Sequence, residues 1–299
     1  MKILNFGSLN IDYVYSVDHF VRAGETISSA LLEQFCGGKG LNQSVAFARA
    51  GAETYHAGCI GPEGKMLVDM LTQSGVNTQF VQTVPTISCG HAIIQVSPSG
   101  ENCILLYGGA NQAITEEMID EVLSHFSVGD LLVLQNEINA LDRIIEKAHK
   151  KGMIIALNPS PFNEKITALD LSLIHWIILN ETEGCEITGE TDPENILNTL
   201  LGKYPHLKVV LTLGSQGSVY ADQTMRAKHG IFKTKAVDTT AAGDTFTGYF
   251  FASVMTEKSP EQALAIASAA SSITVSRKGA APSIPTMEEV KSAGYIDFN

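Results

Sequence analysis

Residues 237–248 read VDTTAAGDTFTG, and this stretch predicts the start of a helix that can face an anion. The small residues Ala241, Ala242 and Gly243 leave backbone N–H groups uncovered, and the N-terminus of a helix adds a partial positive charge. These features suit a transferring phosphoryl group, with Asp244 as a candidate base for the attacking hydroxyl. An acidic residue in a first helical turn also favours the helix dipole without any chemistry, so Asp244 alone is compatible with both interpretations.

The composition of the whole chain is that of a globular protein, and it argues against several classes of protein. The chain has 299 residues, of which 44% are hydrophobic and 17% charged, enough for a large core. A formal net charge of −12 argues against a nucleic-acid-binding surface. Five cysteines without a C-x-x-C pair indicate neither a disulfide framework nor a structural zinc site. No signal-peptide pattern and no membrane-length apolar stretch is found, so we expect a cytoplasmic protein without a membrane partner.

From about residue 115 onward, short apolar runs alternate with helical patterns. A helix is predicted over residues 139–151, with Asn139 as a plausible N-terminal cap. The alternation predicts an α/β fold with a doubly wound, mostly parallel sheet flanked by helices, whose ligands bind beyond the carboxyl ends of the strands. The predicted strands of this sheet cover residues 130–135, 153–157, 175–179 and 208–213.

A second, smaller sheet is predicted from strand patterns that lie apart from the helical segments. We expect it to form a lid, made by insertions at about residues 10–35 and 90–108 of a single domain over residues 1–299. The exposed edges of such a lid would close over a ligand or pair with a second copy of the chain. The strand patterns cover residues 10–17, 27–35, 91–97 and 102–107.

A glycine-rich motif near the N-terminus, GGKGLNQ at residues 37–43, opens a helix that runs to Ala50. Adjacent glycines allow a ligand to approach the backbone closely, and Lys39 and Asn42 supply a cation and an amide at the same end. The motif is not a Walker A loop, because Gly40 follows the lysine. A glycine turn that merely starts a helix explains the motif equally well.

Three later motifs follow predicted strands or helices. Asn180 and Glu183 are three residues apart and suit a hydrated Mg²⁺, although a helix-capping run explains this spacing better on its own. Residues 212–217, TLGSQG, could let the backbone approach a nucleotide, but hairpins use the same pattern. The carbonyls of residues 277–283, RKGAAPS, could help to hold a cation, while an ordinary loop is the simpler interpretation.

Taken together and in this order, the motifs resemble those of the ribokinase (PfkB) family of ATP-dependent sugar kinases. The resemblance covers almost the whole chain and implies a ribokinase-like fold with a small β-sheet lid. The matching segments are residues 7–12, 37–43, 158–161, 180–183, 212–217, 238–248 and 277–285.

The reaction that the resemblance implies is transfer of the γ-phosphoryl group of ATP to the 5-hydroxyl of D-ribose, giving ribose 5-phosphate. Asp244 would be the catalytic base, beside an anion hole at Ala241, Ala242 and Gly243. A family kinase for another furanoside (a nucleoside, pseudouridine or fructose) is the alternative, because family members differ in their lid contacts. In that case an aromatic lid residue, Tyr13, Tyr15 or Tyr107, could stack on a base.

The resemblance also implies ligand residues, ions and a partner. Glu183 would position Mg²⁺ through water, K⁺ would activate the enzyme, and two subunits would pair through their lids. The sugar would be bound by Asn10, Asp12, Gly38, Lys39, Asn42, Glu137 and Asp244. ATP would be bound by Asn180, Thr212, Gly214, Ser215, Gly217 and Gly243. K⁺ would be held at Asp238, Thr240, Thr274, Arg277, Gly279 and Ser283.

Two other classes of protein have less support in the sequence. A non-catalytic sensor on the same fold would be expected to have lost Asp244 or the small residues before it, and both are present. A nicotinamide-dependent dehydrogenase needs G-x-G-x-x-G after its first strand, where this chain has GSLN at residues 7–10.

Overall fold

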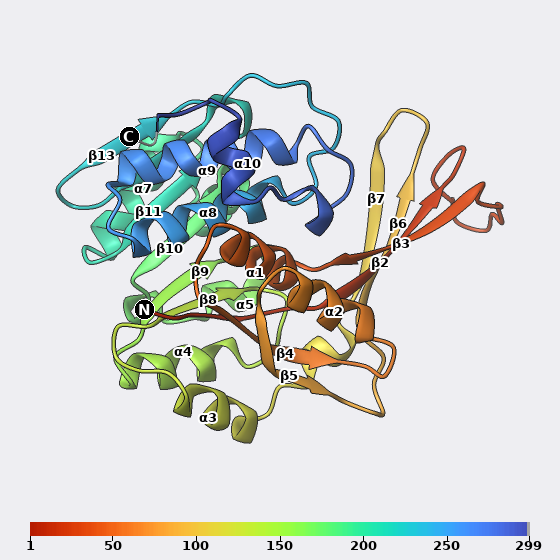
Figure 1. Ribbon diagram of the computed structural model, residues 1–299, viewed down its shortest axis with the longest axis horizontal. Helices are drawn as coiled ribbons and strands as arrows, with labels where there is room; N and C mark the ends of the chain where they lie inside the picture. The colour runs from red at the N-terminus through yellow and green to blue at the C-terminus, as the bar shows by residue number, and fades with distance from the viewer. Residues whose placement is uncertain (298–299) are drawn as a thin grey trace.

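The computed structural model describes residues 1–297, and within that range the strands form a nine-stranded and a four-stranded sheet (Figure 1). Neighbouring strands of the large sheet are parallel from β5 to β11, whereas β12 and β13 are antiparallel additions at one edge. The order across the sheet is β13 (Arg226–His229), β12 (Ser218–Ala221), β11 (Lys208–Thr212), β10 (Trp176–Asn180), β9 (Ile154–Asn158), β8 (Leu131–Gln135), β1 (Ile3–Phe6), β4 (Thr54–Ile60) and β5 (Asn77–Thr83).

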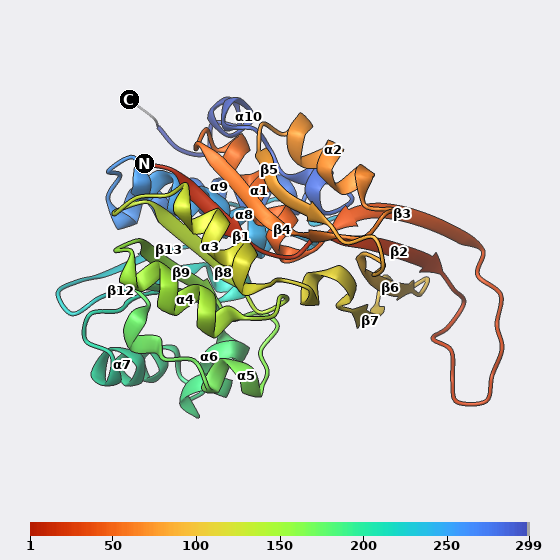
Figure 2. The ribbon, with the colours of Figure 1, turned by 90° about the horizontal axis from the view of Figure 1, so that it is seen from below.

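Helices cover both faces of the large sheet (Figure 2). On one face they are α1 (Lys39–Arg49), α2 (Lys65–Gln73), α8 (Ala242–Met255), α9 (Pro260–Thr274) and α10 (Met287–Ser292). On the other they are α3 (Glu116–Ser124), α4 (Leu141–Lys150), α5 (Glu164–Thr167), α6 (Glu181–Thr188) and α7 (Pro193–Lys203). Short 3₁₀ turns are η1 (Gly109–Gln112), η2 (Leu171–Leu173), η3 (Gly214–Gln216) and η4 (Ala281–Ser283).

Side chains that alternate along the central strands separate the two halves of the core. Leu132 and Leu134 of β8 belong to the core that includes α3, α4 and α7, whereas Leu131 and Val133 belong to the core with α1, α8 and α9. A strand buried on both faces therefore appears in sequence as a continuous apolar run. This arrangement confirms the predicted doubly wound, mostly parallel sheet flanked by helices.

The small sheet starts directly beyond the carboxyl end of β1 and projects from the body of the molecule (Figures 1 and 2). Its two central strands are parallel, and each pairs with an antiparallel outer strand. We call this sheet the lid; that it belongs to a single domain over the whole chain stays a prediction. Its order is β3 (Leu31–Gly37), β2 (Asn10–Ser16), β6 (Gly90–Val96) and β7 (Asn102–Tyr107).

One local prediction was wrong. Asn139 does not cap α4, which follows a left-handed Ala140 with φ of 58° and has no side-chain cap. The Asn139 side chain instead bonds both backbone groups of Ile114, accepting from its N–H at 3.0 Å and donating to its carbonyl at 2.9 Å. Sequence alone does not distinguish a local cap from an amide that bonds a distant loop.

Among residues 1–297, no helix has the length and apolarity that crossing a membrane requires.

Candidate active site

The start of α8 presents uncovered backbone donors, as its small residues predict. Ala241 takes a left-handed conformation with φ of 59°, and no side chain caps the helix. Within residues 1–297, the N–H groups of Gly243 and Asp244 have no hydrogen-bond acceptor. A Cβ on Gly243 would meet nothing within 4 Å, so the space before this turn is open. Free N–H groups at a helix N-terminus are able to bind an anion, and the predicted anion hole at this turn stays a prediction.

Asp244 lies in this first turn and is only 8% exposed. Each of its carboxylate oxygens accepts a hydrogen bond from α1. Asn42 donates through Nδ2 to Oδ2 at 3.0 Å, and Gln43 donates through Nε2 to Oδ1 at 3.0 Å. The glycine-rich motif and the helix-start motif, 202 residues apart at the first of these bonds, thus meet at one carboxylate.

Glu137, which follows β8, joins the same region from the middle of the chain. Its Oε2 accepts hydrogen bonds from the Ser8 hydroxyl and from the backbone N–H of Lys39, the latter at 2.9 Å. Burial raises the pKa of Glu137, and Lys39 opposes this only in part. Burial works against the charged form of Lys39, but nearby carboxylates outweigh it and raise the pKa of the ammonium. Those carboxylates belong to Asp244, Glu137 and Glu183.

Asp12 stands at the base of the lid, beside Gly37. A Cβ on Gly37 would lie 2.0 Å from Asp12 Oδ2, so only glycine leaves room for this carboxylate. Burial, followed by repulsion from Glu137, raises the pKa of Asp12 to about 7. Because burial disfavours the charged carboxylate here, a ligand hydroxyl that donates a hydrogen bond to it would be favourable.

The amide of Asn10 has a fixed orientation. The backbone N–H of Leu9 donates to Asn111 Oδ1 at 2.9 Å, so the other atom of that amide is nitrogen, and it donates to Asn10 Oδ1 at 2.7 Å. The Nδ2 donors of Asn10 are thereby left for another partner. Gly90 of β6 makes room for this pair, since its Cβ would lie 2.0 Å from Asn111 Nδ2.

The residues predicted to bind the nucleotide lie in local turns. Asn180 and Glu183 form a reciprocal capping box at the start of α6, with bonds of 2.9 and 3.0 Å. Residues 213–217 connect the antiparallel pair β11 and β12, and a Cβ on Gly217 would lie 2.0 Å from the His229 carbonyl. Both structural alternatives, a cap and a hairpin, are therefore present, and the ATP role of Asn180, Thr212, Gly214, Ser215 and Gly217 stays a prediction.

The predicted cation residues come together from two loops. Gly279 donates its N–H to Asp238 Oδ2 at 2.9 Å, and Asp238 Oδ1 accepts from Thr240 N at 2.9 Å and Oγ1 at 2.6 Å. The Ser283 hydroxyl donates to the Ala280 carbonyl at 2.7 Å, and the hydroxyls of Thr245 and Thr274 are 3.0 Å apart. The structure thus places these segments side by side, and their role with K⁺ stays a prediction.

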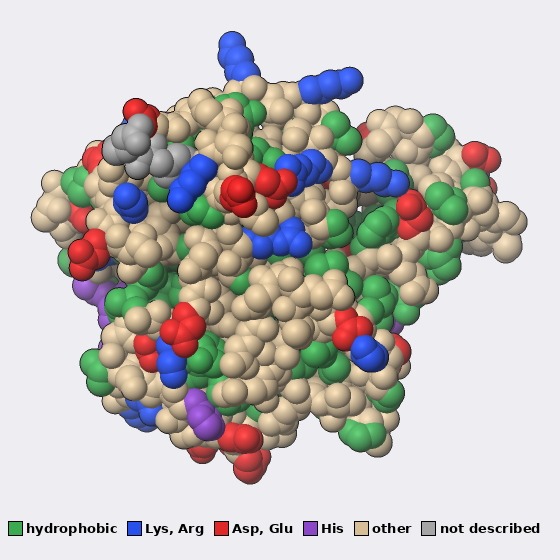
Figure 3. All heavy atoms as spheres, in the orientation of Figure 1, with side chains coloured by type: hydrophobic (Ala, Val, Ile, Leu, Met, Phe, Trp, Pro, Cys, Tyr) green, Lys and Arg blue, Asp and Glu red, His purple; other side chains and the backbone are tan. Residues whose placement is uncertain are grey.

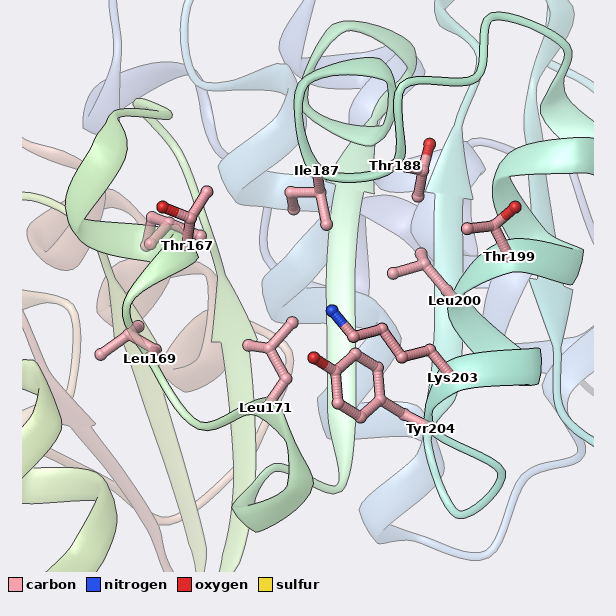
Figure 4. Close-up of a pocket in the computed structure, with 10 residues that line it drawn as sticks. Thr167, Leu169, Leu171, Ile187, Thr188, Thr199, Leu200, Lys203 and Tyr204 are labelled. Atoms are coloured by element: carbon pink, nitrogen blue, oxygen red, sulfur yellow. The ribbon is translucent and has the colours of Figure 1, made fainter.

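Two cavities away from this region contain none of the predicted residues. One of about 90 Å³ lies among α5, α6 and α7, with Lys203 and Tyr204 at its side (Figure 4). The other, of about 430 Å³, lies near Ile3, Ala52 and Met255, at the amino ends of the strands. The concentration of buried charge and amide groups around Asp244 therefore identifies the candidate site better than cavity size does.

Sequence reasoning missed several residues that hold the site together. Gln43 was part of a quoted motif but was given no role, and Asn111, Gln135 and Ser8 were not singled out. Each makes the hydrogen bond that places it in the site with a residue far away in the chain. Only the position of Ser8, just beyond the carboxyl end of the buried strand β1 (Ile3–Phe6), gave a usable signal.

Comparisons with known proteins agree with this architecture. Residues 1–287 match the model of the pfkB family carbohydrate kinases. Ribokinase from Haemophilus influenzae is 37% identical over 294 residues, covering 95% of each chain. The structure of Cryptococcus neoformans ribokinase in complex with ADP superposes with a TM-score of 0.86 at 31% identity, covering 98% of this chain and 99% of that one. Arabidopsis thaliana ribokinase, complexed with ribose and ATP, gives a TM-score of 0.87 at 29% identity, covering 100% and 99%. The predicted ribokinase-like fold is confirmed.

Proposed function

This chain belongs to the pfkB family of carbohydrate kinases, and we propose that it transfers the γ-phosphoryl group of ATP to the 5-hydroxyl of D-ribose. The observation that carries the proposal is the Asp244 carboxylate, held in the first turn of α8 beside free backbone donors and bonded by α1. The relatives named as ribokinases support the choice of sugar. The product is ribose 5-phosphate.

In the proposed reaction the 5-hydroxyl oxygen bonds to the γ-phosphorus while the bond from that phosphorus to the β–γ bridging oxygen breaks, leaving ADP. The hydroxyl proton passes to the carboxylate of Asp244, a transfer that typically contributes ~10²–10⁴-fold in rate. Negative charge on the phosphoryl oxygens is stabilised by the free N–H groups at the start of α8 and by Lys39. Lid closure excludes water as a competing acceptor.

The sugar would lie between the lid base and α1. Asn42 Oδ1 is buried without a hydrogen-bond partner in the described part of the chain, so it offers an acceptor to a sugar hydroxyl. Asp12 adds a second acceptor and Asn10 a donor, which together suit a pair of neighbouring hydroxyls. Gly38 and Glu137 complete the proposed sugar contacts.

The residues present fit the two ions that we propose. Glu183 is 5% exposed and one of its oxygens is held by the Asn180 N–H, so it fits Mg²⁺ through water better than directly. Mg²⁺, when bound, neutralises charge on the phosphates. The loop pair joined by Asp238 and Gly279 fits a monovalent cation, because it holds a carboxylate between two loops just before the start of α8.

The lid supports ribose over a nucleoside as the acceptor. Successive side chains of a strand point to opposite faces, so Tyr13 and Tyr15 lie on the face opposite Asp12. Tyr13 instead packs edge-on against His91, at 5.8 Å between ring centroids, and His91 packs against Tyr107. This cluster is therefore turned away from the carboxylate that would bind the sugar.

We further propose a homodimer that pairs through the lid and resides in the cytoplasm. The five cysteines are all free, as expected in a reducing compartment.

The lid exposes many apolar side chains for its size (Figure 3), and every residue of the outer strand β7 is exposed. The exposed apolar residues of the lid are Leu31, Leu32, Ile93, Ile104, Leu105, Leu106 and Tyr107. Sedimentation of Leu105→Glu against wild type tests the dimer: monomers are expected for the variant, and an unchanged dimer contradicts the lid interface.

The experiment that tests the function is ADP formation from ATP and Mg²⁺ with D-ribose, 2-deoxyribose, fructose or a nucleoside as acceptor, in K⁺ and in Na⁺. We expect ribose to give the highest kcat/KM and K⁺ to raise it. A nucleoside that reacts while ribose does not would overturn the substrate, and the same rate in both salts would overturn the cation role.

A further inference from the structure

Beneath Asp244 lies a chain of buried amides that the proposed phosphoryl transfer does not use directly. Asn5 in β1, Gln43 in α1 and Gln135 in β8 are fully buried between the sheet and α1. Three neutral amides in a core are costly unless their hydrogen bonds are made. Gly7 is needed beside them, because its Cβ would lie 2.3 Å from Gln135 Oε1.

A backbone carbonyl at one end of this row of amides determines which atom of each amide donates and which accepts. The Gly40 carbonyl can only accept, so Asn5 faces it with Nδ2, at 2.7 Å. Asn5 Oδ1 then accepts from Gln135 Nε2 at 2.8 Å, and the same Nε2 donates to Gln43 Oε1 at 2.7 Å. The remaining atom of Gln43 is Nε2, which donates to Asp244 Oδ1 at 3.0 Å. Asp244 can satisfy this donor only as an acceptor at Oδ1.

A second, independent path fixes Gln43 in the same way. Asn158 at the end of β9 donates through Nδ2 to the Ile178 carbonyl at 2.8 Å. Its Oδ1 therefore faces Gln43 Nε2, at 3.4 Å. Two backbone carbonyls, of Gly40 in α1 and of Ile178 in β10, thus demand the same orientation of the Gln43 amide.

We propose that Gln43 is a positioning residue that keeps the Asp244 carboxylate unprotonated at Oδ1 and aimed at the acceptor hydroxyl, with Gln135, Asn5 and Asn158 holding its amide in place. The inference rests on the proposed role of Asp244 as base. A donor locked on one oxygen stabilises the ionised carboxylate and removes its rotational freedom before the substrate arrives.

Other charged groups lie close to Asp244. Lys39 of α1 and Glu137 after β8 both interact electrostatically with its carboxylate, and Lys39 also interacts with Glu183 of α6. His56 ends the network beyond Ser44, where burial lowers its pKa to about 4, so it stays neutral at working pH. Gln43 is thus a neutral donor, like Asn42 on the other oxygen, and its removal changes the bonding of Asp244 without changing this set of charges.

The first test is the pH profile of kcat for Gln43→Met, which keeps the volume of the side chain and removes the donor. We expect kcat at pH 7 to fall ~10–100-fold, the midpoint of the acid limb to rise by about one pH unit, and the KM for ribose to stay within about threefold of wild type. Gln223→Met is the matched control, because the Gln223 amide donates to the Leu201 carbonyl at 2.9 Å, far from the site. The control should lose stability, but its pH profile of kcat should match that of the wild type. An acid limb of Gln43→Met that coincides with wild type overturns the proposal.

Gln43→Glu keeps the proposal testable if the methionine variant does not fold. The Gln135 donor occupies one oxygen of the new carboxyl, so the other must carry a proton to bond Asp244. The acid limb should therefore rise further than in Gln43→Met, and an unchanged limb contradicts the proposal.

A measurement without substrate separates this inference from the proposed reaction. The side-chain carboxyl ¹³C resonance of Asp244, assigned by its loss in Asp244→Asn, is titrated by NMR in wild type and Gln43→Glu. A higher titration midpoint in the variant supports the positioning role even if ribose proves to be the wrong acceptor, and equal midpoints overturn it. Absence of ribose-dependent ADP formation by the wild type instead refutes the proposed function.

Discussion

The two halves of the candidate site are built in opposite ways. The sugar half is held by side-chain bonds between distant segments: Asn42 to Asp244 across 202 positions, Ser8 to Glu137 across 129 and Asn111 to Asn10 across 101. The nucleotide and cation half relies mostly on bonds within one turn: Glu183 bonds a residue three positions away, and Asp238 bonds one two positions away. Its longer bond, from Gly279 to Asp238, spans 41 positions, against 101 to 202 positions in the sugar half.

This difference determines how each half should respond to substitution. A pocket made by long-range bonds exists only in the complete fold, so its groups act as one unit and their substitutions should be strongly coupled. A pocket made from capped turns keeps its local geometry through the motif itself, so single changes there should cause smaller and nearly additive losses.

The largest effect that this comparison predicts comes from Asp244→Asn, at the centre of the sugar half. The amide cannot accept the hydroxyl proton, so kcat should fall by ~10²–10⁴-fold while ATP binding is kept. Steady-state kinetics and ATP titration calorimetry measure the two quantities. Turnover close to wild type would remove Asp244 from the role of base.

Gly37→Ala should produce the next largest effect. The new Cβ would lie 2.0 Å from Asp12 Oδ2 and displace the carboxylate, so the KM for ribose should rise about tenfold or more while the KM for ATP changes little. Gly202→Ala in α7 is the matched control, because its Cβ meets nothing within 4 Å and should stabilise the helix by ~1 kcal/mol. Equal ribose KM values in Gly37→Ala and wild type would place Asp12 outside the sugar site.

A pH dependence should distinguish the halves as well. Burial raises the pKa of Asp12 to about 7, so kcat/KM for ribose should decline below about pH 7 as this carboxylate takes up a proton. Because the raised pKa means that the folded state holds a proton that the unfolded state has lost, Asp12 lowers stability as pH rises from about 4 to 7. Asp12→Asn should therefore weaken ribose binding yet raise the Tm at pH 8. A lower Tm at pH 8 would contradict the buried carboxylate.

The smallest predicted effect lies in the nucleotide half. Asn180→Ala removes the cap of α6, which should cost ~1 kcal/mol of stability, and should raise the KM for ATP about three- to tenfold. Ser259→Ala removes the equivalent cap of α9 and serves as the control. If both variants lose stability equally and neither changes the KM for ATP, Asn180 is a helix cap only.

The same contrast explains how far the sequence alone could lead. Continuous apolar runs such as residues 131–134 indicate strands buried on both faces, and Asn180 with Glu183 already shows the spacing of a capping box. The partners of Gln43 and Asn111 could not be predicted, because no local pattern specifies which distant side chain faces a buried amide. Asn139 shows the converse error, since a good cap residue was taken up by a tertiary contact.

Phosphoryl transfer to the primary hydroxyl is tested most directly by the ³¹P NMR spectrum of the product that the wild-type protein forms from ATP and D-ribose. The position of Asp244 beside the sugar half predicts one ribose-dependent phosphate ester whose phosphorus couples to the two protons of C5. A phosphorus coupled to the C1 proton, or no ester at all, would contradict phosphoryl transfer to the primary hydroxyl.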